Sequence, residues 1–185
     1  MPTVKQTIVK AERIELSDDD LNDLTRGKCN ILTYEDLEKY NTIDEVLGEH
    51  KCAIILFQST EITGHWTTIF TSHQNPNELI FYDPYGWSID SELKYSKYNL
   101  RIHNGQEVPH LSHLIEQSNY KVVSNPNQYQ SNSKDINTCG RHVAVRVVFR
   151  KMSRNQYKHF ILNSFEGMNP DQTVSMLTLL FSHPD

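Results

Sequence analysis

The sequence predicts an α+β fold in which a central mixed sheet is flanked by helices. Three observations predict it: capped helical segments at the start, three strand-like runs in the middle and amphipathic helical patterns at the end. Helices first, strands in the middle and helices last are typical of α+β architecture rather than of alternating α/β units. The 185 residues suit one domain that is long enough to bury a core.

The first third of the chain carries helix start and stop signals. Ser17 precedes an acidic run and is a typical N-cap for a helix that Gly27 ends. Thr33 and Thr42 each precede a short acidic and apolar segment, and Gly48 is a stop signal after the second. The sequence therefore predicts a short helix after each of these three caps.

Three runs in the middle of the chain predict strands. Cys52 to Gln58 is a short apolar run, as expected of a buried strand. His65 to Thr71 is rich in β-branched and aromatic residues, and Glu78 to Asp83 follows after the turn-like segment HQNPN. The three runs are predicted to form an antiparallel meander.

The rest of the chain predicts two further helical regions around one strand and one loop. Residues 84–105 are irregular and rich in Tyr and Asn. A helix is predicted at 109–117 and a strand at 120–123, and a polar loop follows at 125–138. Three more helices are predicted, one from 139 onward and two at about 155–165 and 170–182. From 139 onward, apolar residues at 143, 147 and 148 mark one side of the helix, and the opposite side carries His142, Arg146, Arg150 and Arg154 in i,i+4 steps.

Composition excludes several classes of protein. The net charge of -5 gives no general attraction to nucleic acid. No apolar stretch approaches the roughly 20 residues that cross a bilayer, and the first twenty residues lack the apolar core of a secretion signal. The three cysteines are an odd number without a CxxC pair, which argues against a disulfide framework or a zinc site and favours a reducing compartment.

Three short motifs stand at predicted element boundaries. Gly64-His65-Trp66 begins a strand, Asp83 ends the next strand, and Cys139 stands where the polar loop enters a helix. If the two strands are adjacent and antiparallel, His65 and Asp83 meet at one edge of the sheet. A helix N-terminus favours a thiolate, a neighbouring imidazole holds its proton, and a carboxylate fixes the imidazole in one tautomer. We therefore predict Cys139 as nucleophile, His65 as base and Asp83 as the group that orients the base.

Neighbouring residues predict an oxyanion hole and a substrate cleft. Gly140 leaves room for the substrate carbonyl, and the backbone N–H of Cys139 is one donor to the developing oxyanion. A side-chain amide from the preceding loop is the second donor, with Gln130 and Gln128 as candidates. Each motif also has an ordinary explanation when it is taken alone: a buried thiol, a packed histidine at a strand start and an Asp-Pro-x-Gly turn. Their joint order is what predicts an active site.

These motifs resemble the adenovirus-endopeptidase and ubiquitin-like-protein-specific protease superfamily. GHWTTIF, LIFYDPYG and QYQSNSKDINTCGRHVAVR are similar to its three blocks, over about residues 51–151. The motifs FYDPYG and TCGRHV are more similar to those of proteases from virophages and large DNA viruses than to those of deSUMOylating enzymes. The resemblance matches Cys139, His65 and Asp83 to the triad and Trp66 to the aromatic wall of the cleft. Its oxyanion glutamine usually lies nearer the cysteine, so Gln130 is preferred and Asn137 stays an alternative.

The resemblance implies a permuted papain-like peptidase domain over residues 1–185. It would comprise a helical part at 1–50, a catalytic core at 51–151 and C-terminal helices at 152–185. The implied function is a cysteine endopeptidase that cleaves capsid precursors at small, Gly-containing sites, in the virion or in the host-cell cytoplasm. The alternatives are an isopeptidase acting on ubiquitin-like conjugates and a capsid-binding scaffold without activity. No metal or organic cofactor is expected.

Two further groups of residues are candidate binding sites. His110 and His113 stand three apart on one predicted helix, but without a nearby carboxylate or Cys we interpret them as a solvated helix end. The basic stripe is predicted as the polar face of its helix, and an acidic peptide or DNA activator is a second interpretation. Its residues are His142, Arg146, Arg150 and Arg154.

Overall fold

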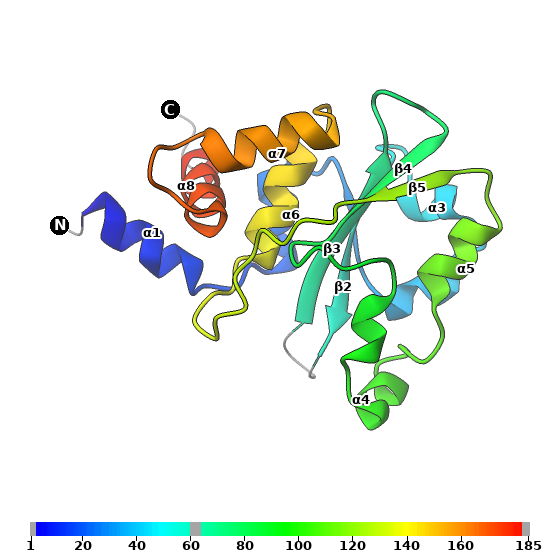
Figure 1. The fold of residues 1–185 in the computed structure, drawn as a ribbon. Helices are drawn as coiled ribbons and strands as arrows, with labels where there is room; N and C mark the ends of the chain where they lie inside the picture. The colour runs from blue at the N-terminus through cyan, green and yellow to red at the C-terminus, as the bar shows by residue number, and fades with distance from the viewer. Residues whose placement is uncertain (1–2, 60–63, 183–185) are drawn as a thin grey trace.

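A five-stranded mixed sheet forms the centre of the computed structural model, which describes residues 3–59 and 64–182. The strands lie in chain order (Figure 1): β1 (Asn30–Thr33), β2 (Cys52–Gln58), β3 (Gly64–Thr71), β4 (Glu78–Tyr82) and β5 (Lys121–Ser124). The three inner strands pair antiparallel, whereas both edge strands pair parallel with their neighbours. This confirms the predicted α+β class and the predicted meander of the middle strands.

Both faces of the sheet are buried, which explains the continuous apolar run of β2. Alternate residues of this strand point to opposite sides. Cys52 and Ile54 belong to one hydrophobic core, and Ala53, Ile55 and Phe57 belong to the other. A strand that is buried on both faces has no need of polar residues at every second position.

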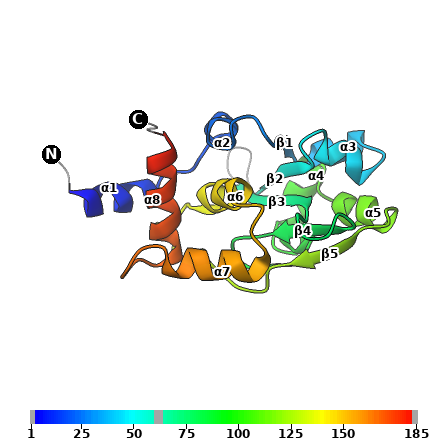
Figure 2. The same cartoon turned by 90° about the horizontal axis from the view of Figure 1, so that it is seen from above.

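The helices form a layer on each side of the sheet, as Figure 2 shows. One core is closed by α2 (Asp18–Thr25), α6 (Cys139–Val148), α7 (Arg154–Asn163) and α8 (Pro170–Ser182), and α1 (Val4–Glu12) packs against α8. The other core is closed by η1 (Glu35–Lys39), α3 (Ile43–Leu47), η2 (Ser91–Lys94) and α5 (His110–Glu116). The segment between η2 and α5 contains α4 (Tyr98–His103).

Local capping signals account for the helices that the sequence predicted. Ser17 and Thr42 form capping boxes with Asp20 and Glu45, so two of the predicted N-caps are confirmed. The predicted end of α2 is also confirmed, since Gly27 follows it with a φ of 64°.

Four elements of the described structure were not predicted individually. One is α1, which lies ahead of the first predicted helix cap. β1 has only four residues and is held by pairing with β2, which places Ile31 opposite Ile54. η2 and α4 lie in the region that was expected to be irregular. Such short elements depend on tertiary contacts more than on local pattern.

The predicted basic stripe is wrong as a surface feature. His142 is 0% exposed and Arg146 is 2% exposed, while Val148 on the supposed apolar side is exposed. The guanidinium of Arg146 stacks on the rings of Phe70 and Tyr157, and it donates to two backbone carbonyls after α6. An activator interface on this stripe therefore loses two of its four residues.

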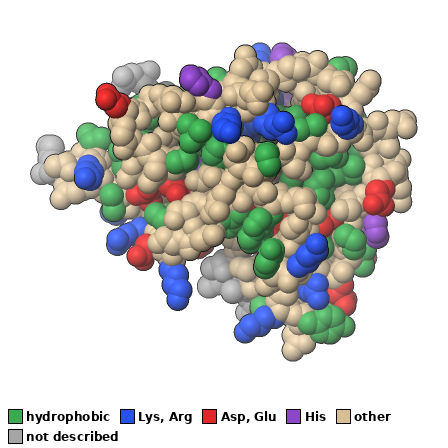
Figure 3. Space-filling model, in the orientation of Figure 1, with side chains coloured by type: hydrophobic (Ala, Val, Ile, Leu, Met, Phe, Trp, Pro, Cys, Tyr) green, Lys and Arg blue, Asp and Glu red, His purple; other side chains and the backbone are tan. Residues whose placement is uncertain are grey.

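The surface near α4 carries both apolar and basic side chains. Tyr95, Tyr98 and Ile102 are exposed there, and Figure 3 shows hydrophobic and basic side chains next to each other at the bottom of the molecule.

Among the described residues, none of the helices combines the length and the apolar character that would take it across a membrane.

Candidate active site

Asp83 directly follows β4 and is fully buried. Its Oδ1 accepts from the backbone N–H of Tyr85 at 2.6 Å, so the residue does form the turn that its sequence context suggests. Asn125 holds the backbone of Asp83 from the neighbouring loop, with its Oδ1 accepting from the Asp83 N–H at 2.9 Å and its Nδ2 donating to the Asp83 carbonyl at 2.8 Å. The turn leaves Oδ2 free to face β3.

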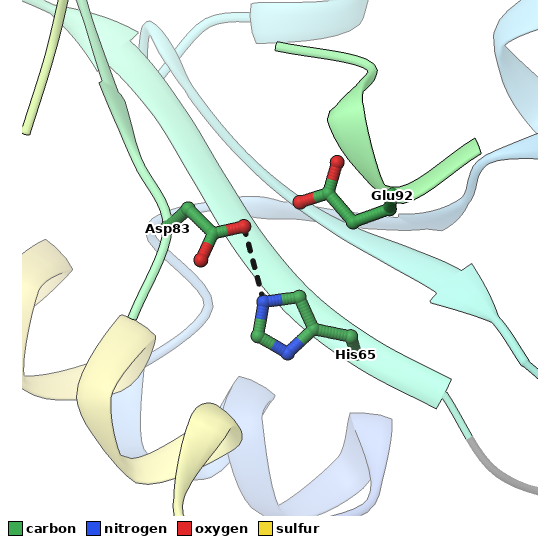
Figure 4. A group of neighbouring side chains, drawn as sticks. All are labelled: His65, Asp83 and Glu92. Atoms are coloured by element: carbon green, nitrogen blue, oxygen red, sulfur yellow. Dashed lines mark hydrogen bonds and ion pairs between the residues drawn. The ribbon is translucent and has the colours of Figure 1, made fainter. Parts of the chain in front are cut away.

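His65, the second residue of β3, meets this carboxylate as predicted. Its Nε2 lies 3.1 Å from Oδ2 of Asp83, and its side chain is 14% exposed. The antiparallel pairing of β3 with β4, with Thr68 opposite Tyr82, brings the two residues to one edge. Figure 4 shows that the second ring nitrogen points away from Asp83. The ring of Tyr85 stacks on the imidazole with centroids 4.7 Å apart and so fixes the ring plane.

Cys139 begins α6 and interacts with the same imidazole. Burial lowers the pKa of His65, but hydrogen bonds and charge from Asp83 and Cys139 outweigh burial and raise the pKa to about 10. Since Asp83 takes Nε2, Nδ1 is the nitrogen left for the thiol. The other cysteines, Cys29 and Cys52, are buried core thiols, as predicted.

Two grooves meet at Cys139. One has a volume of about 530 Å³, the other about 260 Å³, and Glu15, Gly64 and Cys139 line both. Further lining residues of the larger groove include Leu16, Asp18, Leu56 and Trp66. Further lining residues of the smaller groove include His65, Tyr85, Trp87, Glu92, Gln130 and Asn137. A chain laid across Cys139 would therefore find a depression on each side of the sulfur.

Two of the three predicted cleft residues, Trp66 and Gly64, lie in the walls of these grooves. Trp66 lines the larger groove, and its indole N–H donates to the carbonyl of Leu16 at 3.2 Å. Gly140, the third, lines neither groove, but it packs tightly behind the larger one, because a Cβ would lie 3.0 Å from Cβ of Leu16. Gly64 packs on β2, where a Cβ would lie 2.4 Å from the carbonyl oxygen of Phe57.

The three candidate amides for an oxyanion hole occupy different places. Gln130 is 2% exposed and lines the smaller groove; its amide lies 3.5 Å from the carbonyl of Ile136. Asn137 also lines that groove, but its amide donates to the carbonyl of Arg13 at 3.0 Å. Gln128 is exposed and donates to the backbone of Gln130. Of the three candidates, Gln130 lines the same groove as Cys139 and has an amide that makes only one long hydrogen bond, so its amide is the best placed to turn to a substrate.

Comparison with known proteins places the chain in a viral family. No family model matches it. Over 170 residues it is 32% identical to "Uncharacterized protein V9" of Sputnik virophage, and the match spans 91% of this chain and 96% of that protein. The chain belongs to the family of this virophage protein. The name of V9 states no activity, so the geometry of the site is the basis for a proposed function.

The V9-family chain also contains a site residue that sequence reasoning missed. Glu92, on η2, is 5% exposed, and its carboxyl group lies within 4.8 Å of the polar side-chain atoms of His65 and Asp83. Among the described residues, His65, Asp83 and Glu92 are the three side chains that lie close enough together to hold a metal ion. His110 and His113 are not part of such a group. Glu92 lies in a segment without regular pattern, and only the tertiary fold brings it to the triad.

Proposed function

We propose that this chain is a cysteine endopeptidase with the permuted papain-like arrangement of the adenovirus-endopeptidase superfamily. The observation that carries the proposal is the single row of contacts from Asp83 through His65 to Cys139, which ends where two grooves meet. A thiol at a helix start, an imidazole and a buried carboxylate are the parts that thiol catalysis needs.

In the proposed reaction, His65 holds the proton of the Cys139 thiol as an imidazolium, which its raised pKa favours, and the sulfur attacks the substrate carbonyl carbon as a thiolate. The oxyanion receives hydrogen bonds from the Cys139 N–H and the Gln130 amide. The C–N bond then breaks as His65 gives its proton to the leaving amine, and a thioester remains on Cys139. Water attacks the thioester, its proton passes through His65 back to sulfur, and the acid product leaves. Throughout, Asp83 holds the imidazole in the tautomer that presents Nδ1 to sulfur.

The depressions on both sides of Cys139 suit a substrate that continues in both directions, which favours an endopeptidase. The family relationship with a virophage protein and the motif wording support a viral structural protein as substrate. We therefore propose capsid precursors, cut at small, Gly-containing sites, with the enzyme acting in the virion or in the host-cell cytoplasm where virions form.

The test incubates a candidate capsid precursor with the wild-type chain and with Cys139→Ala, and maps the cuts by mass spectrometry. We expect discrete cuts with the wild type, none with Cys139→Ala, and unchanged cuts with Cys29→Ala as the matched control. A fluorogenic ubiquitin-like substrate forms the second arm. Turnover of that substrate alone would replace endopeptidase with isopeptidase, and a wild-type chain inert in both arms would contradict the proposal.

A further inference from the structure

A second buried carboxyl group stands beside the Asp83–His65 pair. Polar atoms of Glu92, Asp83 and His65 all lie within 4.8 Å of one another. Figure 4 shows both carboxyl groups on the side of the ring that carries the hydrogen-bonded nitrogen. Within residues 3–59 and 64–182, neither carboxyl oxygen of Glu92 makes a hydrogen bond of ordinary geometry. A buried, unpaired carboxylate would be costly, so the group requires an explanation.

The position of Glu92 is imposed by the fold. Asp90, two residues earlier, accepts from the hydroxyl of Tyr34 at 2.7 Å and from the backbone N–H of Ser112 at 2.9 Å. Leu93, the next residue, is buried in the core beneath η2. Anchors on both sides therefore deliver the Glu92 carboxyl group to the triad and leave it little freedom to turn into solvent.

Two carboxyl groups so close together and so deeply buried do not both ionise readily. Asp83 has the better reasons to carry the charge, because it faces His65 and accepts from the Tyr85 N–H. Burial and the neighbouring Asp83 raise the pKa of Glu92 to about 10. Burial alone would raise the pKa of Asp83, but His65 and Glu92 lower it overall. The stable arrangement at neutral pH is one carboxylate, Asp83, and one carboxylic acid, Glu92.

We propose that Glu92 is a positioning residue which, as a neutral carboxylic acid, donates its O–H to the Asp83 carboxylate and holds that carboxylate against Nε2 of His65. The inference rests on the proposed function and deepens it, since it names a fourth residue behind the triad. Asp83 would then be restrained from two sides, by the Tyr85 N–H at one oxygen and by the Glu92 O–H. A carboxylate held in this way keeps the imidazole in one orientation.

A divalent metal is the competing explanation, because His, Asp and Glu are ligands that Zn²⁺ accepts. Such an ion would be bound by Nε2 of His65 and Oδ2 of Asp83. These two atoms now form a hydrogen bond of 3.1 Å with each other, which the ion would break. A proton on Glu92 balances the charge without breaking that bond, so we favour the proton. The titratable groups that face Glu92 are His65, Asp83 and, around the smaller groove, Glu15, Tyr85, Tyr95 and Cys139.

The experiment compares Glu92→Gln, which keeps a donor, with Glu92→Met, which has similar length and no donor. The readout is the rate at which iodoacetamide alkylates Cys139 between pH 6 and 9, together with kcat and KM on a peptide where cleavage is found. We expect the Gln variant to stay within about threefold of wild type, and the Met variant to be about tenfold slower in alkylation and kcat with KM unchanged. Glu78→Gln makes the same exchange at a partly buried glutamate at the start of β4, which lines neither groove, and serves as the control.

Several outcomes would overturn the role of Glu92. They are a Met variant that reacts at the wild-type rate, a Gln variant as slow as the Met variant, or micromolar Zn²⁺ that slows alkylation of the wild type but not of the Gln variant. If the Met variant does not fold, infrared titration decides: the wild type must show a protonated-carboxyl band at pH 7 that Glu92→Gln lacks. The two proposals can also fail separately. If alkylation of Cys139 depends on Glu92 but the chain cleaves no peptide, the role of Glu92 is supported and the proposed function is contradicted.

Discussion

The two carboxylate oxygens of Asp83 make different contacts, and the substitution Asp83→Asn can separate the effects of the two contacts. Oδ1 closes the turn through the Tyr85 N–H, and Oδ2 faces Nε2 of His65. In Asp83→Asn one oxygen remains for the turn, but an NH₂ group faces the ring and favours the wrong tautomer. We expect kcat/KM to fall by about 10²–10⁴-fold, and the melting temperature to fall as well, because the buried imidazole loses its charged partner. Glu78→Gln, at the start of β4 and away from both grooves, is the control, and full activity of Asp83→Asn would remove Asp83 from the triad.

The ionisation of His65 predicts how stability depends on pH. The pKa of His65 is raised from an ordinary value near 6.5 to about 10, so the folded state holds a proton that the unfolded state has lost. This stabilisation is complete below pH 6.5 and is lost as the pH rises towards 10. For one proton the slope reaches about 1.4 kcal/mol per pH unit. Glu92, whose pKa is also raised to about 10, adds to the loss in the same window.

Urea denaturation at pH 7, 8 and 9 measures this slope. In His65→Gln, the free energy of unfolding should fall less steeply with pH than in the wild type, by the equivalent of one proton. Equal slopes in the two proteins would show that His65 is not protonated in the folded state over this range.

At the residue scale, the sequence predicts the partners that local geometry brings together. His65 and Asp83 were predictable because two neighbouring strands and a short connection determine their distance. Glu92 was not, because its position depends on the contact between Asp90 and Tyr34, which are 56 residues apart in the chain. No periodic pattern in residues 84–105 records such a contact.

At the element scale, the junction of α6 and α8 supports the nucleophile from behind. Asp171 on α8 accepts from the hydroxyl of Thr138 at 2.5 Å, from the backbone N–H of Ser131 at 3.0 Å and from Nε2 of His142 at 3.0 Å. Thr138 and Ser131 directly neighbour Cys139 and Gln130 in the chain. One carboxylate thus ties the helix start and the oxyanion loop to a third element.

Asp171→Ala tests this junction. Removal of the carboxylate leaves the buried His142 and Thr138 without their partner, and we expect a loss of about 3–5 kcal/mol in the free energy of unfolding. Alkylation of Cys139 should also slow, because the loop is no longer held. Urea denaturation and alkylation kinetics measure both effects, with Gln172→Ala on the same helix as control. A stable variant with normal alkylation would show that the junction does not position the site.

The burial of α6 shows why periodicity alone misassigned its polar face. Every residue from Cys139 to Val147 is buried, since the helix lies between the sheet and the layer of α2 and α8. His142 and Arg146 follow polar spacing, yet they are satisfied inside by Asp171 and by two carbonyls with two aromatic rings. Polar side chains with buried partners cannot be distinguished from solvent-exposed ones by spacing.

At the scale of the whole molecule, the candidate site lies where three distant parts of the chain meet. The sheet supplies His65 and Asp83, and α6 supplies Cys139. The end of α1 and the segment after it close the third side: the carbonyls of Glu12 and Arg13 hold Asn137 at 2.7 and 3.0 Å, and the Leu16 carbonyl holds Trp66 at 3.2 Å. The first fifty residues carry no motif, so their part in the site was not predictable.

The docking of α1 should therefore control the site from a distance. Ile8 on this helix is 4% exposed, whereas its neighbour Val9 is 37% exposed. Ile8→Asp places a charge in the buried contact, and we expect it to lower the free energy of unfolding by about 2–4 kcal/mol. It should also raise hydrogen exchange at residues 131–138 and slow the alkylation of Cys139. Val9→Asp introduces the same charge on the exposed side and should leave all three measurements near wild type; equal effects of the two variants would mean that the docked face of α1 does not support the site.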